Sequence, residues 1–271
     1  MSILITGATG LVGERLVPRL VEAGHECRLL LRTGKTCPPG ATAVTGDILA
    51  PWTLPDAVRG VSAIVHLAAV FRSPDTDLIW RSNLEGTRNL IAAVQAHAPD
   101  ARLILASTSN VYDRNAARPG RETDPVVPDH AYPASKVAAE TLLRESGLIW
   151  SILRFPFIYG DGDGHLDMLP KYLGAAGFHP AHRMSTLHHR DVATAIRLAL
   201  AGAFDGRIVN LSDDAPTTVY ELVGLVGHQM DPSAEAMQDP WYLHVDASLA
   251  RRLGFQPTVR TVYQAVQDGI L

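Results

Sequence analysis

The chain has 271 residues, of which 46% are hydrophobic, and its 24 Lys and Arg against 28 Asp and Glu give a net charge of −4. This composition is typical of a globular protein and excludes a disordered chain, and the charge balance gives no indication of a nucleic-acid partner. No apolar run reaches the ~18–20 residues of a membrane helix. Two cysteines are too few for a disulfide scaffold, and the chain begins on an apolar run instead of a signal peptide. We therefore expect a soluble cytoplasmic protein.

The first 160 residues alternate short apolar runs with longer segments of helical spacing. The runs are rich in Ile, Val and Leu, which is typical of parallel strands buried on both faces. The predicted strands span residues 2–6, 27–31, 63–67, 102–106 and 150–155, and the predicted helices between them span residues 11–23, 78–98 and 134–146. This repeated order predicts an α/β fold with a doubly wound parallel sheet and right-handed crossovers.

Pro18 lies inside the first helical pattern. A proline in a helix interior removes one backbone hydrogen bond and costs about 3 kcal/mol or more. We therefore expect either a kink in this helix or a helix that begins late enough to place Pro18 in an early turn.

The sequence changes character after Gly160. A loop rich in glycine and aspartate at residues 160–164 is followed by shorter elements, with Pro and Gly between them. We expect helices at residues 166–173, at 191–200 and near 219–230, and a strand at 207–211. These elements predict a small mixed lobe that follows the first 160 residues.

A glycine-rich loop joins the first predicted strand to the first predicted helix. Gly7 permits the tight turn, Gly10 lets the backbone approach a pyrophosphate, and Gly13 lets the helix pack closely on the sheet. The phosphates would then bind the N–H groups that a helix leaves unpaired at its first turn. A loop of this kind between a strand and a helix predicts a dinucleotide site.

The spacing Gly-x-x-Gly-x-x-Gly resembles the extended branch of the short-chain dehydrogenase/reductase superfamily, the epimerase/dehydratase-like enzymes. Further motifs resemble this family in the same order along nearly the whole chain. They are Gly46-Asp47-Ile48, His66-Leu67-Ala68-Ala69, Asn83-x-x-Gly86-Thr87, Ser107-Thr108-Ser109-Asn110-Val111-Tyr112, Tyr132-x-x-x-Lys136, Arg154 to Gly160, His189 to Ala193 and Leu253 to Pro257.

The resemblance implies a Rossmann dinucleotide-binding core over residues 1–160. Residues 161–271 would form the substrate lobe and return some elements to the core. It also implies an NAD(P)-dependent oxidoreductase that acts on a small molecule and forms a homodimer through the helices at 78–98 and 134–146.

Tyr132 and Lys136 lie four residues apart and therefore share one face of a helix. A phenol with an ordinary pKa near ~10 is a poor base at neutral pH, and a neighbouring ammonium lowers that pKa. We predict that Tyr132 moves the proton to or from a substrate oxygen and that Lys136 assists it. By resemblance, Lys136 also holds the nicotinamide ribose.

The resemblance adds two more catalytic residues. Thr108, at the end of the fifth strand, would hydrogen-bond the substrate carbonyl, and Asn83 would complete the set. Ser107 and Ser109 flank Thr108, so the assignment among these three hydroxyls stays open at this point.

The resemblance also assigns residues to the cofactor. Asp47 would contact adenine, and the segment His66 to Ala69 would lie beside the ribose. The expected cofactor residues are Gly7, Thr9, Gly10, Leu11, Val12, Gly13, Arg32, Lys35, Asp47, Ile48, Leu67, Ala68, Ala69, Asn83, Tyr132, Lys136, Phe155 and Phe157.

The end of the second strand bears on the choice of nicotinamide cofactor. An acidic residue there would accept hydrogen bonds from the adenosine ribose and repel a 2′-phosphate. Arg32 holds this position, Lys35 follows in the same turn, and arginine makes bidentate contacts with phosphate. The sequence therefore favours NADP. Stacking of Arg32 on adenine, which either cofactor permits, keeps NAD open.

The substrate is the least determined part of the prediction. By resemblance, nucleotide-sugar enzymes often carry an asparagine where this chain has Phe157, and Phe71 and Ser109 also belong to the expected substrate residues. We predict a small or apolar hydroxyl or carbonyl substrate. The alternatives are a nucleotide-sugar epimerase or dehydratase, a non-catalytic NADP-binding redox sensor, and a Phe157 that simply packs in the core.

Histidines 179, 182, 188 and 189 could suggest a metal. No Cys or carboxylate stands near them at a spacing typical of zinc sites, so we expect no metal.

Overall fold

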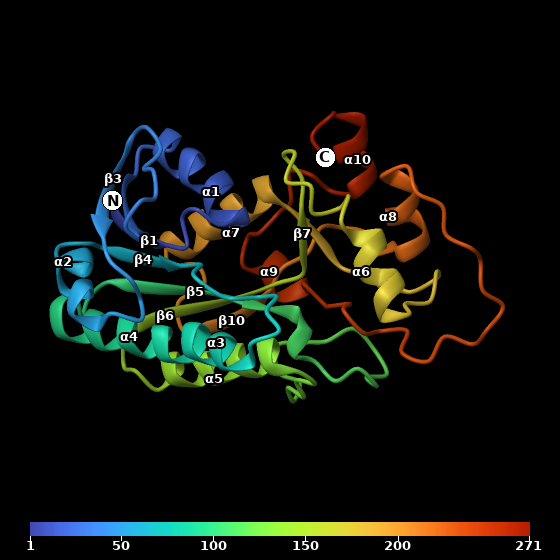
Figure 1. The fold of residues 1–271 in the computed structure, drawn as a ribbon, viewed down its shortest axis with the longest axis horizontal. Helices are drawn as coiled ribbons and strands as arrows, with labels where there is room; N and C mark the ends of the chain where they lie inside the picture. The colour runs from blue at the N-terminus through green and yellow to red at the C-terminus, as the bar shows by residue number, and fades with distance from the viewer. The chain divides into compact units, whose positions relative to one another are not determined.

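The protein is described by a computed structural model that gives the backbone of residues 1–271 and all side chains except those of residues 173–176. Its central sheet has seven strands in the order β10-β6-β5-β4-β1-β2-β3 (Figure 1). The strands are β1 (Ser2–Thr6), β2 (Glu26–Leu31), β3 (Ala41–Thr45), β4 (Ala63–His66), β5 (Arg102–Thr108), β6 (Ile149–Phe155) and β10 (Arg207–Asn210). From β3 to β5 all neighbours pair in parallel. The predicted doubly wound sheet is confirmed.

The chain divides into two compact units. The first consists of residues 1–108, 128–153 and 196–208, and the second of residues 109–127, 154–195 and 209–271. We expected one boundary, at residue 160. In the structure each unit contains three separate segments, because the chain passes between the units several times.

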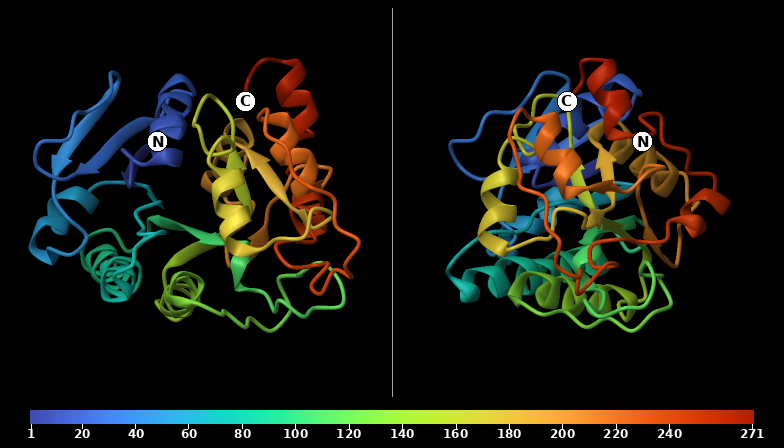
Figure 2. Two further views of the ribbon diagram at one scale, coloured as in Figure 1. Left: turned by 45° about the vertical axis from the view of Figure 1, so that its right-hand side comes forward. Right: turned by 90° about the vertical axis from the view of Figure 1, so that its right-hand side faces the viewer.

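Helices cover both faces of the sheet in the first unit. They are α1 (Leu11–Glu22), the 3-10 turn Pro51–Thr53, α2 (Leu54–Val58), α3 (Thr76–Trp80), the π-turn Arg81–Glu85, α4 (Gly86–His97) and α5 (Ala131–Arg144). Figures 1 and 2 show α4 and α5 on one side of the sheet and α1 on the other. Leu90 and Val94 of α4 and Leu143 of α5 pack with Ile64 and Leu103 of the strands in one fully buried cluster.

The first helix runs through Pro18 without interruption, so the expectation of a late start is wrong. Pro18 and Glu14 are both exposed. Because Pro18 has no N–H, the Glu14 carbonyl oxygen lacks its usual helical donor. At this exposed position the oxygen can bind water instead, and this lowers the free-energy cost of the proline.

The segment predicted as one helix at 78–98 contains a π-turn at Arg81–Glu85 between α3 and α4. A π-turn inserts one extra residue and leaves the apolar periodicity on both sides intact, so the pattern could not reveal it. The strand β3 was also missed. It is the edge strand of the sheet and has exposed residues instead of an apolar run.

The second unit contains short elements around its own core. They are β7 (Phe157–Tyr159), α6 (Leu169–Ala176), β8 (Arg183–Met184), β9 (Thr186–His188), β11 (Thr217–Thr218), α8 (Val219–Leu225), α9 (Ser248–Arg252) and α10 (Val262–Gln267). β7 pairs in parallel with β9, and β11 pairs antiparallel with β8. α7 (His189–Leu200) spans residues of both units. The strand expected at 207–211 is β10, in the central sheet beside β6.

Within the described part of the chain, no helix has both the length and the apolar character needed to cross a membrane. The homodimer expected through the helices at 78–98 and 134–146 stays a prediction.

Candidate active site

Two glycines of the glycine loop lie in close backbone contacts: Gly7 makes the predicted tight turn, whereas Gly13 approaches the loop itself instead of the sheet. Gly7 has φ +72°, and a Cβ built on it would lie 2.6 Å from the Ala68 nitrogen. A Cβ on Gly13 would lie 2.3 Å from the Gly7 carbonyl oxygen. Only glycine fits either place, because any side chain would displace backbone. These contacts bring the loop, the segment after β4 and the start of α1 together.

The start of α1 can accept an anion. Gly10 is the N-cap and offers no capping side chain, so the N–H groups of Leu11, Val12 and Gly13 have no acceptor within the helix. A Cβ built on Gly10 would meet only the Gly7 oxygen, at 3.4 Å, among the described residues. A backbone that is open on this side and ends in unpaired N–H groups fits a pyrophosphate. Thr9, half-buried, lies within the same loop.

The predicted 2′-phosphate residues lie beside this loop. Thr6 at the end of β1 pairs with Leu30 of β2, so the turn that follows β2 lies at the same edge of the sheet as the glycine loop. In that turn the Lys35 N–H donates to the Arg32 carbonyl oxygen at 3.1 Å, and both side chains are exposed. Both side chains therefore leave one exposed turn, and their contact with a 2′-phosphate stays a prediction.

Asp47 and Ile48 follow β3 and have different surroundings. Asp47 Oδ1 accepts a hydrogen bond from the Leu49 N–H at 2.8 Å. Ile48 is buried, and a Cβ on Gly86 would lie 2.6 Å from its Cδ1. The Ile48 side chain therefore packs against the start of α4, and a direct role of either residue in cofactor binding stays a prediction.

A chain of buried hydrogen bonds passes through His66, the last residue of β4. Thr87 Oγ1 donates to the Asn83 carbonyl oxygen at 2.6 Å, so it must accept from His66 Nε2, which lies 2.9 Å away. Burial lowers the pKa of His66 to about 3, so the ring is neutral and its Nδ1 accepts from Thr6 Oγ1 at 2.6 Å. Thr6 Oγ1 in turn accepts from the Ala68 N–H at 3.3 Å. One tautomer of His66 therefore connects the glycine loop to the π-turn.

Asn83 lies in that π-turn and is fully buried. Its Oδ1 accepts from the Val70 N–H at 2.8 Å, and its Nδ2 donates to the Val70 carbonyl oxygen and to Ser135 Oγ, both at 3.0 Å. Ser135 Oγ donates to the Tyr132 carbonyl oxygen at 2.7 Å. Both of its amide hydrogens are bound by protein, and a catalytic role of Asn83 stays a prediction. Its geometry supports a positioning role at the start of α5.

Tyr132 and Thr108 are brought together by the ends of α5 and β5. Their side chains are hydrogen-bonded, and this bond partly offsets the burial that raises the pKa of Tyr132 to about 12. Lys136, one turn further along α5, is 2% exposed. Burial lowers the pKa of Lys136 to about 8, against the attraction of Glu140, which raises it. At neutral pH the phenol is therefore protonated and the amine is mostly an ammonium.

The structure separates the three neighbouring hydroxyls that the sequence left open. Ser107 Oγ donates to Glu140 Oε1 in a short hydrogen bond. Thr108 binds Tyr132. Ser109 begins a 3-10 turn, Ser109–Val111, and belongs to the second unit. Since Ser107 is committed to Glu140, Thr108 has the geometry expected of the carbonyl-binding residue.

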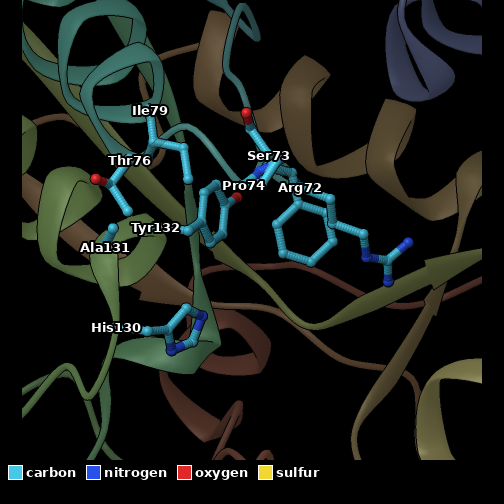
Figure 3. Close-up of a pocket in the computed structure, with 9 residues that line it drawn as sticks. Arg72, Ser73, Pro74, Thr76, Ile79, His130, Ala131 and Tyr132 are labelled. Carbon is cyan, nitrogen blue, oxygen red and sulfur yellow. The ribbon is translucent and has the colours of Figure 1, made fainter. Parts of the chain in front are cut away.

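A cavity of about 510 Å³ opens beside Tyr132 in the first unit (Figure 3). The Phe71 ring lies 4.6 Å from the Tyr132 ring, centroid to centroid, at an interplanar angle of 59°. The Arg72 guanidinium carbon lies 4.5 Å from the centroid of the Phe71 ring. The lining residues are Phe71, Arg72, Ser73, Pro74, Thr76, Ile79, His130, Ala131 and Tyr132.

Most of this lining was not predicted as part of the site, although Phe71 and Tyr132 were. The sequence offered one usable signal, since residues 70–76 follow directly after the motif at the end of β4. In a parallel sheet such segments emerge at the edge where ligands bind. The contribution of His130 could not be inferred, because it depends on where α5 begins.

The two phenylalanines expected near the cofactor lie in the second unit. Phe155 ends β6 and is buried. The Phe157 ring stacks on the His165 ring at 4.3 Å and 19°, and it packs against the core of that unit. These contacts favour the packing alternative for Phe157, and its contact with a ligand stays a prediction.

No group of three or more metal-ligating side chains occurs among the residues that the structure describes. Two of the histidines have structural partners instead. His189 Nε2 lies 2.8 Å from Asp163 Oδ2, and His188 Nε2 lies 2.8 Å from the Ile270 carbonyl oxygen.

The sheet order, the glycine loop after β1 and the Tyr132–Lys136 pair on α5 together define a short-chain dehydrogenase/reductase. Residues 3–212 match the family model described as the NAD dependent epimerase/dehydratase family. The chain belongs to this family and is an NAD(P)-dependent enzyme.

Known proteins resemble the chain over most of its length. It is 29% identical over 250 residues to a 3-beta-hydroxysteroid dehydrogenase from Mycolicibacterium neoaurum. The aligned segment covers 81% of this chain and 68% of that protein. A crystal structure of a short-chain dehydrogenase/reductase superfamily protein from Agrobacterium tumefaciens with bound NAD matches with TM-score 0.80 and 26% identity, over 99% of this chain and 95% of that one. The UDP-glucose 4-epimerase from Thermotoga maritima with UDP-glucose matches with TM-score 0.81 and 22% identity, over 98% and 96%.

The close approach at Gly7 generates a test. In Gly7→Ala the new methyl group would collide with the backbone at Ala68, at a positive φ that alanine rarely adopts. We expect the affinity for NADPH, measured by fluorescence titration, to fall by at least about tenfold, which corresponds to 1.4 kcal/mol.

Gly24→Ala is the matched control. Gly24 has φ +80°, but no atom of the described residues lies within 4 Å of its built Cβ. This variant carries the same backbone strain without the collision and should bind NADPH like the wild type. Equal affinities in the two variants would contradict the role given to Gly7.

Proposed function

We propose that the protein is an NADP-dependent carbonyl reductase that acts on a small, largely apolar ketone or on the corresponding alcohol. The observation that carries this proposal is the hydrogen-bonded pair of Tyr132 and Thr108 beside a cavity with apolar walls. When bound, the nicotinamide supplies the hydride.

The residues at this site suit proton donation to a carbonyl oxygen. The raised pKa of Tyr132 keeps its hydroxyl protonated at neutral pH, ready to donate. Thr108 would hydrogen-bond the same substrate oxygen. The buried Lys136 ammonium stabilises the phenolate that remains after proton transfer, because an opposite charge nearby favours the charged form. The same groups would serve the reverse reaction.

The cavity supports an apolar substrate. Phe71, Pro74 and Ile79 give it carbon-rich walls, and the Phe71 side chain is 41% exposed directly beside Tyr132. An exposed aromatic ring beside a reactive group is typical of ligand pockets. The similarity to a 3-beta-hydroxysteroid dehydrogenase, an enzyme named for a hydroxysteroid, supports the same class. The Thermotoga epimerase shares the fold alone.

Removal of the proton donor tests the mechanism. Tyr132→Phe keeps the ring beside Phe71 and should still bind NADPH, but kcat for a reducible ketone should fall by about 10²–10⁴. The measurement is the consumption of NADPH at 340 nm with a panel of apolar ketones.

Tyr220→Phe makes the same substitution at an exposed tyrosine and should leave kcat unchanged. Wild-type turnover in Tyr132→Phe would reject Tyr132 as the donor. The result does not depend on the cofactor that the enzyme prefers.

Arg32 tests the choice of cofactor. We expect NADPH to bind more tightly than NADH, because the exposed Arg32 and Lys35 follow β2, where the 2′-phosphate would lie. Loss of one charge-assisted hydrogen bond costs about 1.5–3 kcal/mol, or roughly 10- to 150-fold in affinity. Arg32→Ala should therefore weaken NADPH by this factor and leave NADH nearly unchanged, as measured by calorimetry.

Arg59→Ala removes another exposed arginine, which pairs with Asp56, and controls for a general loss of positive charge. Equal affinity of the wild type for NADPH and NADH would contradict the NADP preference.

Phe71 tests the substrate class. Phe71→Ala removes an apolar wall and should raise KM for apolar ketones by roughly tenfold or more, since burial of an aromatic side chain is worth about 1.5–3 kcal/mol. Phe71→Leu retains most of the apolar surface and should have a smaller effect. Calorimetric titration with UDP and dTDP in the presence of NADPH is the competing measurement. Micromolar binding of either nucleotide would favour the nucleotide-sugar alternative instead.

A further inference from the structure

Helix α5 carries two buried charged residues, Lys136 and Glu140. Tyr132, Lys136 and Glu140 follow each other at intervals of four residues and therefore share one face of the helix. Lys136 is 2% exposed and Glu140 is 3% exposed. Burial of an ammonium or a carboxylate costs several kcal/mol per ion unless a partner compensates it. The Glu140 carboxylate, one turn further along α5, supplies an opposite charge that favours the Lys136 ammonium.

Glu140 is also anchored to the sheet. Ser107, itself 4% exposed, donates its hydroxyl hydrogen to Glu140 Oε1. Ser107 directly precedes Thr108, whose side chain binds Tyr132. The Glu140 carboxylate therefore joins the end of β5 to the middle of α5, through the residue that precedes Thr108.

The charge of Glu140 acts against the desolvation of Lys136. Burial alone favours the neutral amine, whereas the Glu140 carboxylate favours the ammonium, and the resulting pKa of Lys136 is about 8. Among the described residues, His66 on β4 is a further titratable group that interacts with the Lys136 charge, and Tyr132 lies one turn before Lys136 on the same helix. His66 stays neutral, because burial and the Lys136 charge both lower its pKa. Glu140 is therefore the anionic group that keeps the amine charged.

We propose that Glu140 is a positioning residue of the active site, which holds Lys136 in its charged form and fixes the Ser107–Thr108 end of β5 against α5. This inference rests on the proposed function, since the charge of Lys136 matters to turnover only if Tyr132 transfers a proton. Glu140 could not be selected from the sequence, because a glutamate in a helix is most often on a solvated face.

The test reads the protonation of Lys136 directly. The chain contains only three lysines, Lys35, Lys136 and Lys171. Labelling with ¹³C-lysine therefore gives three Cε signals, and Lys136→Met identifies the one of interest by its disappearance. Titration of the full-length wild type should show the Lys136 signal with a midpoint near pH 8. A wild-type midpoint below neutral pH would overturn the proposal without any Glu140 variant.

Glu140→Gln removes the charge and keeps an oxygen that can accept from Ser107. Glu140→Met removes the charge and the polar atoms together, a change that buried ionic sites often tolerate. In either variant that retains the wild-type circular dichroism spectrum, the Lys136 midpoint should fall by about 1 pH unit or more, as loss of a close opposite charge predicts. An unchanged midpoint in a folded variant overturns the proposal.

Glu145→Gln is the matched control, since Glu145 is an exposed glutamate at the end of the same helix and should leave the midpoint in place. With a reducible ketone, the alkaline limb of the kcat profile should move to lower pH in Glu140→Gln, while the KM for NADPH changes little. The NMR titration needs no substrate. Absence of turnover on every ketone would therefore reject the proposed function, and an unchanged Lys136 midpoint would reject the role of Glu140.

Discussion

Thr6 at the end of β1 pairs with Leu30 of β2 on one side and with His66 of β4 on the other, and this parallel register determines where the functional segments of the first unit lie. Parallel strands end at the same edge of a sheet, so the glycine loop, the arginine turn after β2 and the segment after β4 emerge together. His66 pairs in turn with Leu105 of β5, which brings Thr108 to the same edge. A shift of one residue in any of these pairs would turn its side chains to the opposite face.

The buried polar groups of this edge are mutually dependent. The bonds that pass through Thr6, His66, Thr87 and Asn83 each use one donor and one acceptor, so the order of the hydrogens is determined throughout. A typical hydrogen bond contributes about 0.5–1.5 kcal/mol net, but a buried partner left without one costs about 1–3 kcal/mol. These hydrogen bonds therefore contribute little to the free energy of unfolding, but they select one defined arrangement of the buried side chains. They link the loop that fits a pyrophosphate to the π-turn that supports the start of α5.

Some of the family motifs in the second unit hold that unit together by buried hydrogen bonds. Asp191 is fully buried and accepts hydrogen bonds from the Thr258 N–H and hydroxyl and from the Val259 N–H, at 2.6, 2.8 and 3.0 Å. It therefore attaches the start of α7 to a segment almost seventy residues later. The Tyr112 hydroxyl donates to Asn210 Oδ1 at 2.6 Å and accepts from the Arg154 guanidinium at 2.9 Å. A family motif thus marks residues that fold the chain as well as residues that meet a ligand.

The sequence by itself determined the sheet, the glycine loop, the Tyr132–Lys136 pair and the position of Arg32. These features depend on local patterns: apolar runs, glycines that need a positive φ or a close approach, and two side chains one helical turn apart. The tertiary structure decided the features that depend on partners distant in sequence. Ser107 and Thr108 are adjacent hydroxyls of similar chemistry, and the burial of Glu140 and the direction of Tyr132 separate their roles. The partners of the Asn83 amide, Val70 and Ser135, were likewise visible only in the tertiary structure, because no local pattern records where a buried hydrogen bond ends.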